Sequence, residues 1–217
     1  MNLIALFKNN NTVLFLTVIL NVIAFTYFSN LFLISDTLYY NTFAEQLTIE
    51  KIEGIIEQSH KWAWVGYLLL PIIYYVKFLL ITLVLQTGFF FFERKVSFSI
   101  IFKAVMLAEA PFLIVPIIKL FWFLFIQTHY DLNDLQYFFP LSALQLFDVQ
   151  KLPSWQVYPL QLLNVFELIY WVLLAYWLKK LLNLSLNKSM EVVVSSYGTG
   201  LLLWVVFITF LSLNIAS

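Results

Sequence analysis

The sequence predicts an all-α, polytopic integral membrane protein whose single membrane domain, 1–217, is a helical bundle of five transmembrane helices. Composition is the first reason: 62% of the residues are hydrophobic and 11% are charged, and the mean hydropathy is +0.89. Soluble domains average about 45–50% apolar and about 25% charged residues. The second reason is that the apolar residues are gathered into runs of membrane-spanning length.

Each apolar run is long enough for a helix to cross a hydrocarbon core about 30 Å thick. The predicted spans are about 12–34, 64–92, 97–126, 158–180 and 191–214, and they leave two longer connections, 35–61 and 127–157. The first run is too long for the apolar core of a signal peptide, and no small-x-small cleavage motif follows it. We therefore expect it to be retained as a span.

Basic residues near the span ends predict the orientation of the bundle. One side carries Lys8, Arg94, Lys95, Lys179, Lys180 and Lys188, with Lys103 close to it. The other side carries Asp36, Glu45, Glu50, Glu53, Glu57, Asp131, Asp134 and Asp148, together with Lys51, Lys61 and Lys151. Because cytoplasmic ends are enriched in lysine and arginine, the N-terminus is predicted inside and the C-terminus outside.

The two longer connections are therefore outer loops, and each is predicted to hold local helix. In loop 35–61, Thr42 followed by Glu45 has the spacing of a capping box, and apolar residues after it follow a helical stripe. This predicts an amphipathic helix that either packs on the bundle or membrane surface or offers a docking surface. In loop 127–157, segment 138–148 is apolar but too short to span, which predicts an interfacial or re-entrant helix.

Ionisable residues inside the spans are the candidate functional residues. At about 1.5 Å per residue, Lys77, Glu109 and Glu167 each lie about 18–22 Å from the inner boundary, near mid-depth. An ionised group at the bilayer centre costs about 2.5–3.5 kcal/mol on insertion scales. We therefore expect Lys77 to lie between the two glutamates and pair with them. Asn164, one turn before Glu167, shares its face and is expected to donate a hydrogen bond, which completes a predicted intramembrane polar cluster.

Two interpretations of this cluster stay open at the level of sequence. It either fixes how spans 2, 3 and 4 pack, as polar groups do in membranes, or lines a path for protons, ions or lipid headgroups. Pro71, Pro111 and Pro116 bend their helices and free backbone carbonyls, which fits a curved packed bundle or a gated cavity.

Several function classes are not expected. The chain has no HExxH, GxSxG or Gly-rich phosphate loop, so we expect no enzyme activity. It has no cysteine, and its two histidines, His60 and His129, lie outside the spans, so no metal site and no cofactor are predicted. Charge is balanced, with 12 Lys+Arg against 12 Asp+Glu, and no basic patch indicates a nucleic-acid partner.

Two stretches carry a family resemblance. In VSFSIIFKAVMLAEAPFLIVPII (96–118), a small loop precedes a span with an acid-Ala-Pro centre. In LSALQLFDVQKLPSWQVYPLQLLNVFELIYWVLLAYWLKKLLNLSLNKSMEVV (141–193), a Leu-Ser-rich segment precedes a helix with Asn-x-Phe-x-x-x-Tyr-Trp, a short basic turn and Lys-Ser. Over about residues 60–215 the chain resembles short bacterial members of the Ypt/Rab-interacting (YIP) membrane-protein superfamily, to which the five spans and predicted topology are also similar.

The resemblance implies a non-enzymatic role as a scaffold or accessory subunit of a membrane complex, with membrane lipids and integral membrane proteins as partners. Eukaryotic members engage small GTPases through long cytosolic N-terminal regions. Only 1–11 precede the first span here, so GTPase binding is not inferred. The residue usage, eleven lysines to one arginine, indicates a low-GC genome and a bacterial inner membrane. The alternative function is a small transporter or channel that uses the Lys/Glu cluster.

Overall fold

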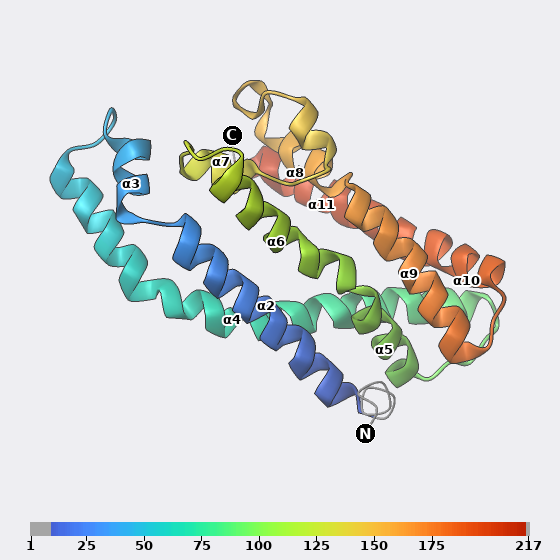
Figure 1. Ribbon diagram of the computed structural model, residues 1–217. Coiled ribbons are helices and arrows are strands. Elements are labelled where there is room, and N and C mark those ends of the chain that lie inside the picture. The colour runs from blue at the N-terminus through green and yellow to red at the C-terminus, as the bar shows by residue number, and fades with distance from the viewer. Residues whose placement is uncertain (1–9, 216–217) are drawn as a thin grey trace.

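The computed structural model describes residues 10–215, and over this range the chain is helical, without a β-strand (Figure 1). Four helical segments are long and apolar enough to cross a membrane: Asn11–Leu33, Ile49–Phe91, Phe98–Phe125 and Leu186–Asn214. Large apolar side chains are exposed on all four, as contact with lipid requires. The all-helical, membrane-embedded class is therefore confirmed. Residues 1–9, with Lys8 of the predicted inner-side set, lie outside the described residues.

The helices follow one another in a fixed order between two ends of the bundle. They are α2 (Asn11–Leu33), α3 (Asp36–Phe43), α4 (Ile49–Phe91), α5 (Phe98–Ala108), α6 (Ala110–Phe125), α7 (Leu132–Tyr137), α8 (Ser154–Leu162), α9 (Val165–Leu182), α10 (Leu186–Val192) and α11 (Thr199–Ile215). Two 3-10 turns, η1 (Ala143–Leu146) and η2 (Val149–Lys151), precede α8, and one π-helical turn, η3 (Val193–Gly198), joins α10 to α11.

Turns between the long helices gather at one end of the bundle, which we call the basic end. Turn 92–97 joins α4 to α5, turn 183–185 joins α9 to α10, and residues of both turns line one pocket. Asn11, at the start of α2, donates hydrogen bonds to the backbone and side chain of Ser99 there. The opposite end holds α3, α7 and α8, with the end of α11 beside them (Figure 1); we call it the acidic end.

The first outer connection differs from the predicted amphipathic helix. α3 stops at Phe43, and α4 begins at Ile49 and continues without a break through the predicted span. Thr42 opens no capping box with Glu45, so that prediction is wrong. Its hydroxyl donates to the carbonyl of Leu38 and accepts the backbone N–H of Leu132, which ties α3 to α7. α4 contains Pro71 and is visibly bent (Figure 1), because proline removes a backbone donor and clashes with the preceding turn.

The fourth predicted span, 158–180, is not one continuous helix. α8 ends at Leu162 and α9 begins at Val165. The second outer loop pairs with this break: Ala143 N–H donates to the carbonyl of Leu163 at 2.8 Å, and Val165 N–H donates to the carbonyl of Leu141 at 3.1 Å. In place of the predicted helix over 138–148 there is only the 3-10 turn η1, because this backbone is used to hold the break.

The core lies where α9 packs along α5. Tyr170, Leu174, Ala175 and Leu178 of α9 are fully buried, and they meet fully buried residues of α5 such as Ala104. α9 also carries Glu167, Lys179 and Lys180. Because its neighbours shield α9 from the surroundings, this helix does not need the uniform hydropathy of a lipid-facing span.

Candidate functional site

The structure places the Lys77 ammonium against the Glu109 carboxylate, with Nζ 2.6 Å from Oε1. The Glu109 side chain is 0% exposed, whereas the Lys77 side chain is 37% exposed. The pair therefore sits at the edge of the bundle, with its negative member inside and its positive member reaching the surface. An ion pair of this burial is held by geometry that satisfies both charges, since removing either one leaves the other uncompensated.

Glu109 occupies a break in the helical path of the third span. α5 ends at Ala108 and α6 begins at Ala110, with Pro111 in its first turn. Proline has no N–H to donate and disfavours helical backbone in the residue before it, so a helix restarts more readily than it continues at this point. Glu109 Oε1 binds Lys77, and Oε2 is buried without a hydrogen-bond partner among the described residues.

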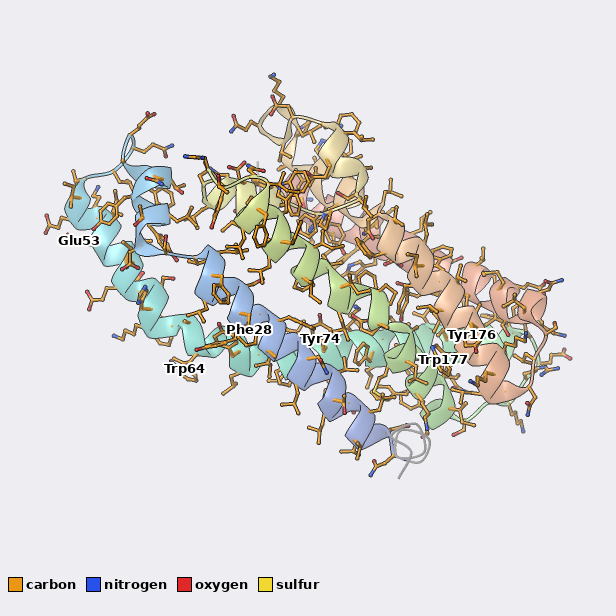
Figure 2. All side chains as sticks on the ribbon, viewed as in Figure 1. Phe28, Glu53, Trp64, Tyr74, Tyr176 and Trp177 are labelled. Carbon is orange, nitrogen blue, oxygen red and sulfur yellow. The ribbon has the colours of Figure 1, made fainter. Side chains whose placement is uncertain are left out.

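Aromatic rings surround the lysine of the pair. Lys77 Nζ lies 4.7 Å from the centre of the Phe112 ring and 5.4 Å from that of Tyr74, which labels this region in Figure 2. A cation within about 6 Å of a ring centre is attracted by the negative face of the ring. The ammonium is thus stabilised by one carboxylate and two rings, in a region where water is scarce.

Glu167 does not join this pair. Its Oε1 accepts hydrogen bonds from the Tyr197 hydroxyl at 2.7 Å and from the Trp171 indole N–H at 2.8 Å. The prediction that Lys77 lies between two glutamates is therefore wrong for Glu167. The reason is that Glu167 lies in the first turn of α9 and faces the π-helical turn η3, where Tyr197 supplies the partner.

Asn164 caps α9 and donates nothing to the carboxylate. Its Oδ1 accepts the backbone N–H of Glu167 at 2.8 Å, and its Nδ2 donates to the carbonyls of Gln161 and Leu162 at 3.0 and 3.1 Å. The predicted side-chain hydrogen bond to Glu167 is wrong, because the chain breaks just before Asn164 and makes it the first residue outside the helix. The spacing Asn-x-x-Glu is the signal that marks such a start.

Tyr170 stands between the Lys77–Glu109 pair and the Glu167 group. It is fully buried, and its ring centre lies 5.5 Å from that of Phe112 on one side and 5.5 Å from that of Tyr197 on the other. The predicted cluster is therefore two polar groups separated by packed aromatic rings. The aromatic members were missed at the level of sequence, because tyrosine and tryptophan do not stand out in an apolar run as charges do.

We expect Tyr197→Phe to lower the free energy of unfolding in detergent by about 1–3 kcal/mol, the contribution of a hydrogen bond to a carboxyl group. The phenyl ring keeps the packing against Tyr170 and Trp171 and removes only the donor to Glu167. Tyr176→Phe is the matched control, since Tyr176 is exposed on α9. Equal stability of the two variants would show that the hydroxyl of Tyr197 contributes nothing.

The two histidines lie apart from both groups. His60 Nε2 is 3.0 Å from Asp36 Oδ1, an exposed pair joining α4 to α3, whereas His129 hydrogen-bonds with Thr128 in the second outer loop. Within residues 10–215, no group of three or more His, Cys, Asp or Glu side chains is arranged to hold a metal ion.

Comparison of the chain with protein-family models, with curated proteins and with solved structures finds no match. The resemblance to the YIP superfamily stays a prediction that rests on the two quoted stretches.

Proposed function

We propose that the protein crosses a bacterial inner membrane five times and acts, without catalysis, as a scaffold or accessory subunit of a membrane complex. The observation that carries this proposal is the exposure of Lys77. Its side chain reaches the surface of α4 in the middle of an apolar segment whose neighbours, Ile73 and Leu80, are also exposed. That surface is suited to another integral membrane protein.

Five crossings are supported by the way the chain alternates between the basic and acidic ends. α2, α4, α5 with α6, α9, and α10 with α11 each run between these ends (Figure 1). α9 joins the four helices of evident spanning length as a shielded fifth crossing. Arg94, Lys95, Lys179 and Lys180 lie at the basic end, which places that end and the N-terminus in the cytoplasm by the positive-inside rule.

A partner is favoured by the free energy of the lysine in lipid. An ionised side chain at the centre of a bilayer costs about 2.5–3.5 kcal/mol on insertion scales. Glu109 and the Phe112 ring offset part of this on the inner side, and the outer side faces hydrocarbon in an isolated chain. A neighbouring transmembrane helix with a hydrogen-bond acceptor at that depth complements the exposed ammonium and shields it from lipid.

Transport through a Lys/Glu path receives less support. The carboxyl groups of Glu109 and Glu167 have separate partners, and the fully buried Tyr170 fills the space between them. A solute path needs consecutive polar groups at mid-depth. We therefore propose that these side chains serve packing and assembly, in line with the non-enzymatic role implied by the YIP resemblance and without GTPase binding.

A photo-cross-linking amino acid at Ile73, one turn before Lys77, is expected to give a discrete adduct with one membrane protein in intact cells. The same amino acid at Leu203, which is exposed on α11, is the matched control and is expected to react with lipid alone. The protein captured at position 73 must also co-purify in fixed stoichiometry from a mild detergent. Equal adduct patterns at the two positions would contradict a specific partner on α4.

A further inference from the structure

A pocket at the basic end lies between two turns that end helices. Its lining residues are Glu93, Arg94, Lys95, Val96, Leu182 and Leu184. Glu93 (φ 55°) and Asn183 (φ 53°) have left-handed backbone, the conformation in which many helices end. Because α4 and α9 stop there and the chain reverses, the pocket opens at the level where membrane-spanning helices end.

The charges around this pocket favour an anion. Arg94 and Lys95 line it and are exposed, and Lys179 and Lys180 lie in the last turn of α9 beside it. Glu93 is the one carboxylate in the lining, so positive charge exceeds negative charge. The ion pairs of the described chain are His60–Asp36, Lys77–Glu109 and Lys151–Asp148. Arg94 and Lys95 are in none of them, and their donors are available to a ligand.

Apolar and aromatic groups flank the same pocket. Phe90 and Phe91, the last residues of α4, are 75% and 77% exposed. On α9, Tyr176 and Trp177 lie towards this end (Figure 2), and Lys180 Nζ is 5.1 Å from the centre of the Trp177 ring. Aromatic residues next to basic ones are typical of the boundary between lipid tails and headgroups.

We propose that this pocket binds the phosphate group of an anionic phospholipid. Arg94 and Lys95 donate hydrogen bonds to the phosphate oxygens, as guanidinium and ammonium groups do, and Phe90 and Phe91 contact the acyl chains. The bound lipid then bridges turns 92–97 and 183–185 and so holds the ends of α4 and α9 together. This inference depends on membrane embedding and is independent of the proposed partner at Lys77.

Native mass spectrometry of the full chain in detergent tests the site. Purified protein is titrated with phosphatidylglycerol or with phosphatidylcholine of the same acyl chains. Wild type is expected to retain one phosphatidylglycerol, and Arg94→Gln with Lys95→Gln to weaken that binding about 30-fold, the effect of two basic residues beside an anionic lipid. Lys51→Gln with Lys61→Gln, which removes two exposed lysines near the acidic end of α4, is the matched control and is expected to bind as wild type.

Arg94→Lys with Lys95→Arg keeps both charges and is expected to retain the lipid, which separates loss of binding from loss of folding. Equal retention of the two lipids by wild type, or equal weakening by the two glutamine pairs, would overturn the proposal. Inorganic phosphate is expected to leave the bound lipid in place. Displacement by inorganic phosphate at a concentration equal to that of the lipid would assign the pocket to a free anion and overturn the lipid site.

Discussion

Replacing either member of the Lys77–Glu109 pair is expected to lower the free energy of unfolding by about 3–5 kcal/mol, the largest effect of any single substitution in the chain. Lys77→Met leaves a fully buried carboxylate, and Glu109→Leu leaves an ammonium with only aromatic rings near it. Combining the two removes both charges, so the double variant is expected to be much more stable than the sum of the two losses predicts. Unfolding in mixed detergent, followed by tryptophan fluorescence, measures all three.

The exposed ion pair between Lys151 and Asp148 is the control for this cycle. Their charged atoms are 2.8 Å apart, yet their side chains are 83% and 52% exposed. Exposed pairs contribute little to stability, so Lys151→Met is expected to unfold as wild type does. If Glu109→Leu unfolds as wild type too, the buried pair does not stabilise the bundle.

Gly88→Ala is expected to have the second largest effect, because α4 and η3 cross there at close range. A Cβ atom at Gly88 would lie 2.4 Å from Cβ of Ser196 and 2.6 Å from its Oγ. Such close approach through small residues is a common way for membrane helices to pack. The added methyl group must force the helices apart, at a cost of about 1–3 kcal/mol, seen as a lower melting temperature in detergent.

Gly66→Ala provides the matched control on the same helix, since a Cβ atom at Gly66 meets nothing within 4 Å. Alanine there is expected to leave stability unchanged or to raise it by up to about 1 kcal/mol, because alanine favours helix over glycine. Ser196→Gly removes the clashing side chain and is expected to recover most of the loss in Gly88→Ala. Equal melting of Gly88→Ala and Gly66→Ala would mean that the crossing is looser than the contact at Ser196 requires.

The sequence predicted where helices lie better than where they end. Runs of apolar residues mark α2, α4 and α11 because lipid-facing helices must be apolar on every exposed turn. Hydropathy is blind to a break that is satisfied by hydrogen bonds. The gap between α8 and α9 lies in an unbroken apolar run, and the backbone of 141–143 satisfies it from a distant part of the chain. The cap at Asn164 was the local signal for it.

For the candidate site, the cost of buried charge predicted that Lys77 needs a carboxylate, and Glu109 provides it. The partner of Glu167 was not predictable in the same way, because the choice depends on how α9 and η3 are rotated about their axes. A π-helical turn holds one more residue than an α-helical turn and shifts the faces that follow it. Tyr197 lies within that turn and so reaches Glu167.

The most direct measurement of the proposed scaffold role is the mass of the particle extracted in a mild detergent, for wild type and for the Lys77→Met, Glu109→Leu double variant. Wild type is expected in a stoichiometric complex larger than the 25.5 kDa chain. The double variant is expected to fold but to be released from its partner, since the exposed ammonium is gone. A lone 25.5 kDa chain for wild type, or an undiminished complex for the folded double variant, would contradict assembly through Lys77.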